Sequence, residues 1–237
     1  MDKSVENTKP IKNRKRFAKV LNISIIVIAV IVLAIEGVLY YQRSYLTPFW
    51  VNGQSMYPTL NLHAKNALGE EVGTLGGGAA PGYTVDYGVM DCHKSAINKI
   101  KRFDIIVTKY KKSDTNNKIK RVLGLPGEKI YFVSTGKGNE HNGDMYINSK
   151  LVEQPIEAEF IQSGDYSAVT NEIQLGSNEY FVCGDNRGHS SDSRAEGPIQ
   201  KEWITGKVVA LCGTAVVYQD GSYYDVKDIK YSWPRYL

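Results

Sequence analysis

The stretch KIKRVLGLPGEKIYFVS, Lys118–Ser134, is the part of the sequence that most clearly indicates the fold. Two runs of β-branched, aromatic and aliphatic residues, KIKRVLGL and EKIYFVS, flank the proline and glycine of LPGE, which are typical of a tight turn. Neither run has the period of a helix. The pattern therefore predicts two short strands of an antiparallel sheet.

The same pattern recurs on both sides of this stretch. Short β-prone runs separated by turn sequences occur at DIIVTKY (Asp104–Tyr110), DMYINSKLV (Asp144–Val152), NEYFVCG (Asn178–Gly184) and KVVALCGTAVVY (Lys207–Tyr218). We therefore expect residues 42–237 to form one mainly β domain, built from antiparallel sheet around a single sizeable core.

One region of this domain, residues 63–98, departs from the pattern. It contains GEEVGTLGGGAAPGYTVDYG (Gly69–Gly88), which is rich in glycine and poor in core-forming periodicity. We expect a surface insertion, either ordered or flexible. Its length suggests a function, in substrate choice or in the docking of a surface-assembly partner.

The longest apolar segment, VLNISIIVIAVIVLAIEGVLYY (Val20–Tyr41), precedes the β domain. As a helix it extends roughly 33 Å, enough to cross a bilayer. A cleaved signal peptide, a buried core helix and a retained signal anchor all fit this length. No small-x-small cleavage site follows, and Tyr40 and Tyr41 continue the segment into an aromatic belt, so we favour the anchor. Glu36 lies near the outer end, where a carboxylate is tolerated.

Basic residues gather in KPIKNRKRFAK (Lys9–Lys19), directly before the apolar segment. This asymmetry predicts a cytoplasmic N-terminus (1–19), a transmembrane segment (20–41) and an extracytoplasmic domain after Gln42. The 29 Lys and Arg residues barely exceed the 25 Asp and Glu residues, and their excess is local. Such a charge distribution argues against a nucleic-acid partner.

The three cysteines, Cys92, Cys183 and Cys212, have no metal-binding spacing to one another or to a histidine. We therefore expect no metal and no cofactor. Because the number of cysteines is odd, at least one thiol is expected to be free, with Cys212 the first candidate. Pairing of Cys92 with Cys183 remains open.

Three stretches carry more polar chemistry than folding requires: VNGQSMYPTL (Val51–Leu60), IKRVLGLPGE (Ile119–Glu128) and GDNRGHSSDSRAEG (Gly184–Gly197). A serine becomes a nucleophile when a base takes its proton and donors stabilise the oxyanion. Burial can lower the pKa of a lysine and convert it into such a base. Strand alternation places Lys118 on the face of Lys120 and Arg121 on the other face, so the pattern does not show which face is buried.

These blocks resemble the type I signal peptidases, membrane-bound serine proteases. The family pattern S-M-x-P-T matches Ser55–Thr59, K-R-x-x-G-x-P-G matches Lys120–Gly127, and G-D-N-x-x-x-S-x-D-S-R matches Gly184–Arg194. The blocks also follow one anchor in the family's order. The resemblance implies the family's antiparallel β catalytic domain, and it covers most of the chain from the anchor to about Cys212.

The resemblance also implies a role for each matching residue. Ser55 is the expected nucleophile and Lys120 the general base. Ser190 is expected to orient the lysine by a hydrogen bond, and the backbone N–H of Ser55 to donate to the oxyanion. Asp185, Asp192 and Arg194 are expected to support the site structurally; a triad of Ser55, His189 and Asp192 is the less favoured alternative.

Three positions differ from common family patterns. Gly53 stands where some members carry a side-chain hydroxyl, so the second oxyanion donor is open, with Gln54 or water as candidates. Glycine also allows backbone conformations closed to other residues, which is sufficient reason for Gly53. Glu128 replaces a more usual Asp, and Phe103 replaces a common Gly; we expect neither to touch the chemistry.

The resemblance implies that the substrates are exported precursor proteins cut at small-x-small sites, presented just above the lipid bilayer. An extended peptide would bind by strand addition, with Met56, Tyr57 and Pro58 as candidate rim residues. Phe49 and Trp50 suit a membrane-facing surface. Two alternatives are a non-catalytic or specialised surface or pilus-assembly factor on the same scaffold, and a relative of the self-cleaving repressors. The intact Ser55 and Lys120 argue against the first, and the anchor argues against the second.

Overall fold

The computed structural model describes residues 9–72, 75, 78–134, 143–156, 161 and 171–237. It divides into two compact units, residues 1–45 and 46–237. Along the chain, the boundary between the units falls between Tyr45 and Leu46, four residues beyond the end expected for the apolar segment. Each unit is described by itself.

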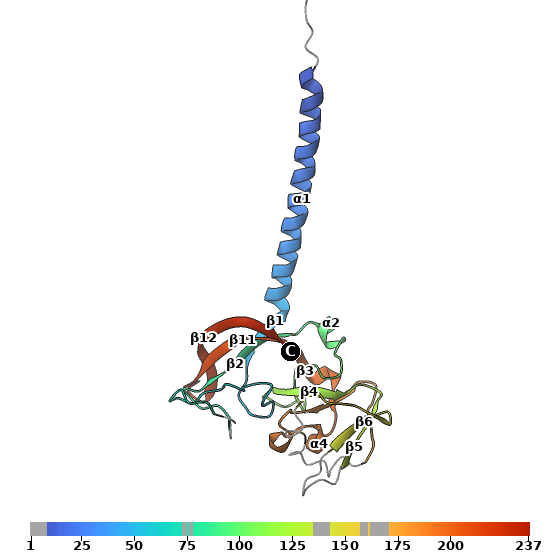
Figure 1. Ribbon diagram of the computed structural model, residues 1–237, viewed down its shortest axis with the longest axis vertical. Coiled ribbons are helices and arrows are strands. Elements are labelled where there is room, and N and C mark those ends of the chain that lie inside the picture. Colours follow the sequence, from blue (N-terminus) through green and yellow to red (C-terminus); the bar gives the residue numbers. More distant parts are fainter. Residues whose placement is uncertain (1–8, 73–74, 76–77, 135–142, 157–160, 162–170) are drawn as a thin grey trace, which may run out of the picture. The chain divides into compact units, whose positions relative to one another are not determined.

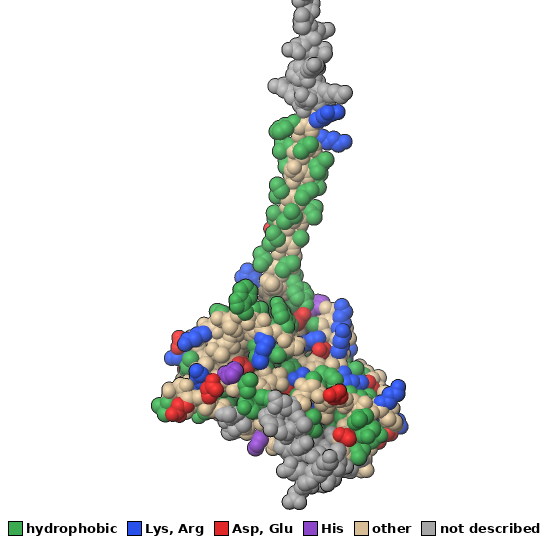
Figure 2. All heavy atoms as spheres, in the orientation of Figure 1, with side chains coloured by type: hydrophobic (Ala, Val, Ile, Leu, Met, Phe, Trp, Pro, Cys, Tyr) green, Lys and Arg blue, Asp and Glu red, His purple; other side chains and the backbone are tan. Residues whose placement is uncertain are grey.

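The first unit is the helix α1 (Lys9–Tyr45), which contains the whole segment expected to be apolar. Its aliphatic side chains between Val20 and Leu39 are exposed on all sides, as Figure 2 shows. By length and composition, residues 16–45 can cross a membrane, and among the described residues no other helix can. Exposed apolar side chains along a helix of this length are typical of a segment that faces lipid.

The second unit is built on antiparallel sheets, as the alternating runs predict (Figure 1). Within the described residues, the larger sheet has eight strands in the order β1-β2-β11-β3-β4-β9-β10, with β12 paired to β11. Its strands are β1 (Leu46–Trp50), β2 (Thr84–Asp91), β3 (Ile105–Thr108), β4 (Lys118–Gly124), β9 (Glu179–Cys183), β10 (Ile199–Gln200), β11 (Ile204–Asp220) and β12 (Tyr223–Tyr236). The expected mainly β fold is confirmed.

A smaller sheet follows β4. In the described part of the chain its order is β7-β6-β5-β8, with β5 (Lys129–Ser134), β6 (Gly143–Ile147), β7 (Lys150–Leu151) and β8 (Ile173–Gln174). Short helices connect the strands: α2 (Lys94–Ile97), η2 (Arg187–His189), α4 (Ser193–Glu196) and η3 (Lys201–Trp203). The turn between β4 and β5 is the predicted LPGE, where Glu128 N–H donates to the Leu125 carbonyl and Gly127 has a φ of 80°.

The expectation of an insertion over residues 63–98 is wrong for its second half. Thr84–Asp91 is the strand β2, which pairs with β1 on one side and β11 on the other. Val85 is fully buried and packs with Leu75, Ala79 and Val217. The glycines around it hid this strand from the sequence pattern, although TVDYGVMD itself alternates in burial.

The C-terminal strand β12 also escaped the sequence pattern. It follows a turn at Gly221 and pairs with β11 along most of its length, with two register shifts. Five of its aromatic side chains are exposed: Tyr223, Tyr224, Tyr231, Trp233 and Tyr236. Because β12 has a partner on one edge and little cover on its faces, its residues lack the inward-outward alternation that identifies a half-buried strand.

Candidate active site

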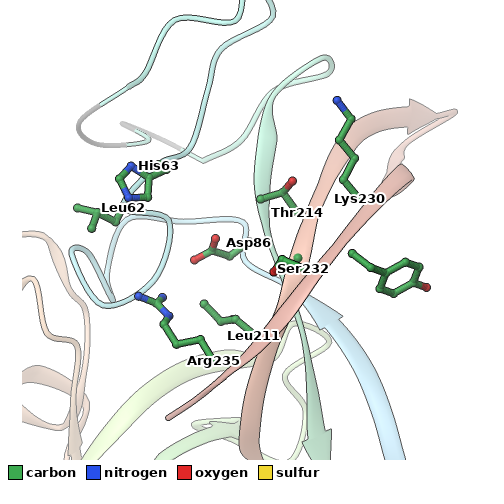
Figure 3. A pocket seen from close by; sticks show the side chains of 10 residues that line it. Leu62, His63, Asp86, Leu211, Thr214, Lys230, Ser232 and Arg235 are labelled. Atoms are coloured by element: carbon green, nitrogen blue, oxygen red, sulfur yellow. The ribbon is translucent and has the colours of Figure 1, made fainter.

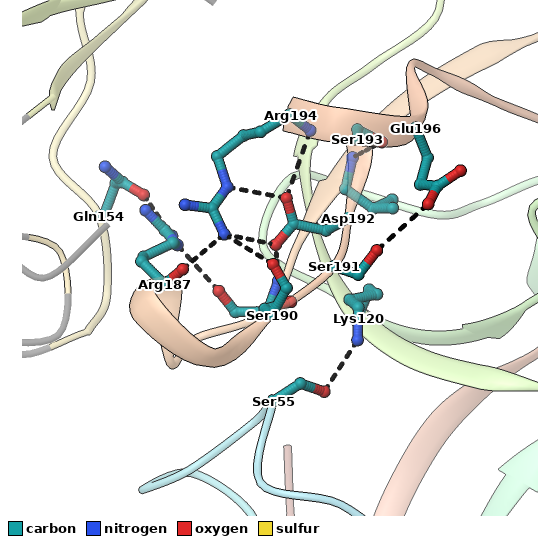
Figure 4. A network of polar contacts seen from close by, with 12 residues as sticks. Ser55, Lys120, Gln154, Arg187, Ser190, Ser191, Asp192, Ser193, Arg194 and Glu196 are labelled. Atoms are coloured by element: carbon teal, nitrogen blue, oxygen red, sulfur yellow. Dashed lines mark hydrogen bonds and ion pairs between the residues drawn. The ribbon is translucent and has the colours of Figure 1, made fainter. Parts of the chain in front are cut away.

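Ser55 and Lys120, from the first and second motifs, meet at the centre of the site. Lys120 Nζ donates a hydrogen bond of 2.8 Å to Ser55 Oγ and another, of 3.1 Å, to the carbonyl of Ile119. Figure 4 shows the lysine side chain pointing toward the serine on its loop. The two residues are 65 positions apart in the sequence, so the tertiary fold brings them together.

Lys120 is buried, with 3% of its surface exposed, because β4 is a central strand covered on both faces. Ile119 packs against one apolar core, Val122 belongs to a second and Leu123 to a third. Burial of the ammonium group lowers the pKa of Lys120 from 10.5 to about 8, although the nearby carboxylate of Asp192 opposes the shift. The charge of Lys118 adds to the lowering.

Alternation along β4 does not divide the strand into one buried and one exposed face. Lys118 is exposed because it begins the strand. Lys120 and Arg121, which alternation places on opposite faces, are both buried. Both faces of the strand are therefore inside the protein from Lys120 onward, as in sheets that are covered on both sides.

Two buried apolar side chains fix the loop that carries Ser55 to the hydrophobic core. Met56 and Leu60 are almost completely buried in the core inside the larger sheet, and Leu60 N–H donates to the Met56 carbonyl at 2.9 Å. Asn61, with a φ of 62°, donates from Nδ2 to the carbonyls of Val51 at 2.9 Å and Gly53 at 3.3 Å. These contacts fix the backbone on both sides of the serine.

Arg121 and Asp185 connect all three motifs. The Arg121 guanidinium donates to both oxygens of Asp185, at 2.8 and 2.6 Å, and Thr59 Oγ1 donates to Asp185 Oδ2 at 2.6 Å. Arg121 Nη1 also donates to the Phe103 carbonyl at 2.9 Å. The serine loop, the lysine strand and the third motif are thereby joined through one buried, bidentate ion pair.

Asp192 and Arg194 form a second buried ion pair, drawn in Figure 4. Arg194 Nε donates to Asp192 Oδ1 at 2.8 Å, and Gly184 N–H donates to Oδ2 at 3.0 Å. Burial raises the pKa of Asp192, but the hydrogen bond and charge of Arg194 outweigh it, so the pKa lies below its ordinary value. Arg194 also donates to the carbonyls of Arg187 and Ser190, at 2.7 and 3.1 Å.

The expected hydrogen bond between Ser190 and Lys120 is not formed in this structure. The hydrogen bonds of Lys120 Nζ go to Ser55 Oγ and the Ile119 carbonyl instead. Ser190 Oγ is buried beside Asp192, where it helps to lower the pKa of that carboxylate. A Cβ added to Gly184 would overlap both Ser190 Oγ and the Ser55 carbonyl, so these groups crowd around a glycine.

The alternative triad of Ser55, His189 and Asp192 is not assembled. His189 is exposed, and its backbone N–H donates to the Asn186 carbonyl at 3.0 Å. Asp192 is occupied by Arg194 and the Gly184 N–H. A histidine base needs a carboxylate bonded to its ring, and Asp192 does not fill that place.

The serine and the lysine open into a groove of about 970 Å³. Its lining comes from four parts of the chain: residues 47–56 with Gly78, residues 115–120, the loop residues His189 and Ser191, and residues 222–224 at the start of β12. Met90 and Val107 complete it. Met56 lines the groove as expected of a rim residue, whereas Tyr57 and Pro58 are not among its lining residues.

A second hollow, of about 450 Å³, lies between β2, β11 and β12. Figure 3 shows Asp86 and Arg235 directed into it. Asp86 Oδ2 accepts the N–H of Asn61 at 2.6 Å, and burial raises the pKa of this carboxyl. Arg235 Nη2 donates to the Thr59 carbonyl at 2.8 Å, so this side chain supports the loop that carries Ser55.

The structure shows the surroundings of the three positions that differ from common family patterns. Gly53 lacks the left-handed φ that would require glycine, and a Cβ placed on it would meet nothing within 4 Å. Phe103 has a φ of 72°, a conformation that is strained for a bulky residue and that glycine adopts without strain. Its carbonyl also accepts from Arg121, so Phe103 is connected to the site after all. Glu128 pairs with Arg102 at 2.6 Å.

The three thiols are all free, so Cys92 and Cys183 do not pair. Cys183 is buried in the core with Leu123, and burial raises its pKa. Cys212, expected in an apolar strand, is half-buried on β11. In the part of the chain that the structure describes, no three His, Cys, Asp or Glu side chains gather in a way that could hold a metal ion.

Comparison with known proteins identifies the family. The model of the signal peptidase family, peptidase S26, matches residues 20–213, and the chain therefore belongs to this family of serine endopeptidases. Signal peptidase I U of Bacillus subtilis (strain 168) is 32% identical over 188 residues, which cover 78% of this chain and 81% of the relative. Signal peptidase I of Bacillus caldolyticus is 32% identical over 170 residues, 67% of this chain and 74% of the relative.

Among solved structures, a signal peptidase I from Enterococcus faecalis V583 is 24% identical, with a TM-score of 0.35. The match covers 46% of this chain and 96% of that chain.

Sequence reasoning found the two central residues but missed several that hold them. All of these residues lie inside the three motifs: Thr59, Arg121, Asn186 and Arg187. The first three bond to a residue of another motif, and Arg187 bonds to Gln154. Asn186 N–H donates to the Ser55 carbonyl at 3.1 Å, which ties the third motif directly to the nucleophile loop. Their position in the motifs was the available signal.

Proposed function

We propose that this chain is a membrane-anchored serine endopeptidase that removes signal peptides from exported precursor proteins at small-x-small sites. Ser55 is the nucleophile and Lys120 the general base. The hydrogen bond of 2.8 Å between Lys120 Nζ and Ser55 Oγ carries this proposal. The pKa of Lys120, lowered to about 8, makes a neutral amine accessible near physiological pH.

The reaction runs in two halves. The neutral amine of Lys120 takes the proton of Ser55 Oγ as this oxygen attacks the scissile carbonyl, and the resulting ammonium returns the proton to the leaving amine of the mature protein. An ester between Ser55 and the signal peptide remains. Water then attacks this ester, with Lys120 accepting its proton and passing it to Ser55 Oγ as the signal peptide leaves.

The developing oxyanion requires donors directed at the groove. The backbone N–H of Ser55 is the donor we assign, because within the described residues it donates to no other group. Gly53 contributes no side chain, and the open space at its Cβ position lies at the groove. The first half of the reaction therefore depends on the serine loop staying fixed by Asn61 and Asn186.

The groove supports the proposed substrate class. Residues 52–56 and residues 115–119 line it, and we place an extended peptide between these two segments. We place the N-terminus in the cytoplasm and the β domain outside, since Lys9–Lys19 is basic and precedes the apolar helix.

Reconstitution in liposomes with a precursor carrying an intact signal peptide tests the proposal. The wild-type protein is expected to release the mature protein with a new N-terminus after a small-x-small sequence, as read by mass spectrometry. Ser55→Ala and Lys120→Met are expected to abolish cleavage, whereas Ser191→Ala, a serine in the same groove, retains it. Cleavage that persists in Ser55→Ala would refute the assignment.

A further inference from the structure

The groove has a wall that comes from the C-terminal hairpin. The hairpin tip is defined here as Ser222, in the turn between β11 and β12, together with Tyr223 and Tyr224, which begin β12. All three residues line the groove that holds Ser55 and Lys120. The family match ends at residue 213, so the tip lies outside the matched part of the chain. It is therefore a feature of this chain that the family pattern does not account for.

The hairpin tip is held firmly relative to the serine loop. Val217 and Val226, from the two arms of the hairpin, pack in one core with Trp50 and Ala79. Val217 exchanges backbone hydrogen bonds of 2.8 Å with the loop before β2, accepting from Gly82 and donating to Tyr83. In this same loop, Ala79 N–H donates to the Asn52 carbonyl at 2.8 Å, three residues before Ser55.

The turn itself is well formed. Gly221 has a φ of 60°, which a glycine adopts without strain, and Gln219 Nε2 donates to its carbonyl at 3.0 Å. Asp220 and Tyr223 face each other across the hairpin, as do Gln219 and Tyr224. The two tyrosines are therefore fixed at their backbones, and their side chains are free to contact a bound molecule.

Tyr223 and Tyr224 are exposed and do not belong to a hydrophobic core. Their exposed fractions are 79% and 46%, so neither ring is placed there to stabilise the fold. Each ring offers a large apolar face at a low cost in conformational entropy, which is why tyrosine is common in binding surfaces. Pro48, Phe49 and Trp50 line the same groove and add further apolar area.

The charges of the groove narrow the ligand chemistry. Among the described residues that line it are Lys118, Lys120 and His189 but no Asp or Glu. A cationic side chain would find no carboxylate partner there and would face the like charge of Lys118. The aromatic rings and the absence of acidic groups therefore favour an uncharged, apolar side chain.

Resting on the proposed function, we infer that the hairpin tip is a specificity-determining subsite that binds one apolar side chain of the precursor peptide. The tip adds affinity without entering the chemistry, because the hydrogen bonds of Lys120 go to Ser55 and Ile119 and not to the tip. Contact outside the reacting groups acts equally in the ground state and the transition state, so it changes KM and leaves kcat unaffected.

Steady-state cleavage of a precursor by the full-length protein tests this inference. The variant Tyr223→Ser with Tyr224→Ser is expected to raise KM about tenfold, the equivalent of about 1.4 kcal/mol, with kcat unchanged. Tyr223→Phe with Tyr224→Phe keeps the rings and is expected to retain the wild-type KM. Tyr236→Ser removes an exposed tyrosine from the same strand outside the groove and is the matched control.

The contacted position is found with precursors in which the apolar residues around the cleavage site are replaced by serine one at a time. At one position the effects of the peptide and enzyme changes are expected to be non-additive, as for residues in contact. An unchanged KM in the double serine variant, or additivity at every position, overturns the inference while cleavage by the wild type continues. Loss of wild-type cleavage, with Ser55→Ala identical, instead refutes the proposed function.

Discussion

Arg121 on β4 and Asp185 after β9 form a bidentate ion pair, with Nε–Oδ1 and Nη2–Oδ2 distances of 2.8 and 2.6 Å. Both side chains are buried, and Asp185 also accepts from Thr59. The pair is therefore the structural link between the loop of Ser55 and the strand of Lys120. Its loss should disturb the geometry of the dyad without removing either member of it.

Asp185→Ala is expected to destabilise the β domain by about 3–5 kcal/mol, because it leaves the buried Arg121 guanidinium without its partner. Activity should fall together with stability. Chemical denaturation of the full chain in detergent gives the free energy of unfolding. A double change, Asp185→Leu with Arg121→Met, should recover much of the stability, since no unpaired charge remains; equal instability of the double variant would contradict this account.

Lys120→Met is expected to abolish cleavage yet make the folded protein more stable near pH 7. Burial lowers the pKa of Lys120 from 10.5 to about 8, so the folded state loses stability wherever the unfolded lysine is protonated. This penalty is on the order of 3 kcal/mol for a shift of this size below pH 8. It shrinks as the pH rises from 8 to 10.5 and then disappears.

The measurement is the difference in unfolding free energy between wild type and Lys120→Met at a series of pH values. Lost hydrogen bonds to Ser55 and Ile119 reduce the advantage of the variant by a constant amount. Whatever its size at pH 7, the difference between the two unfolding free energies should therefore change as the pH rises and then reach a constant value. A difference that does not change between pH 7 and pH 10.5 would show that the pKa of the lysine is not lowered.

Asp192→Asn is expected to lower stability at neutral pH through the loss of the buried pair with Arg194. Because the pKa of Asp192 lies below its ordinary value of 3.8, its contribution is present above that value and is lost as the pH falls through the folded pKa. The melting temperatures of variant and wild type should approach each other in acid. An inactive Asp192→Asn protein with normal thermal stability at pH 7 would argue for a direct chemical role instead.

Gly184→Ala is expected to impair cleavage severely, because a Cβ there overlaps the backbone carbonyl of Ser55 as well as Ser190 Oγ. A backbone group cannot rotate away as a side chain can, so the nucleophile loop must shift. Gly53→Ala, where the same added methyl meets nothing within 4 Å, is the control and should fold normally. Kinetics of both variants on one precursor, with their melting curves, make the comparison; equal activity in the two would contradict it.

The parts of this fold that depend on local pattern could be predicted from the sequence. The strands β3, β4, β5 and β9 coincide with β-prone runs bounded by turn residues, and LPGE forms the turn between β4 and β5. The positions of Ser55 and Lys120 in recognisable motifs pointed to a pair that the structure brings within 2.8 Å. These features are encoded within a few consecutive residues, which is why the sequence shows them.

The features that depend on long-range packing could not be predicted. β2 lies in a glycine-rich region, and its identity as a strand comes from pairing with β1 and β11, which are distant in sequence. The burial of Arg121 comes from Asp185, 64 residues away. Ser190 was expected to bond Lys120, but its hydroxyl is buried elsewhere, on a loop whose Ser190 carbonyl accepts a hydrogen bond from Arg194. No local pattern carries such information.

The pH dependence of kcat/KM for a precursor tests the central claim, that Lys120 is the base for Ser55, most directly. A lysine with a pKa of about 8 must lose its proton to act, so kcat/KM should rise roughly tenfold per pH unit below this value and level off above it. The stability of the precursor and of the protein is checked at each pH. A profile that is flat from pH 6 to 9, or one that rises around pH 6.5 as a histidine base would give, contradicts the account.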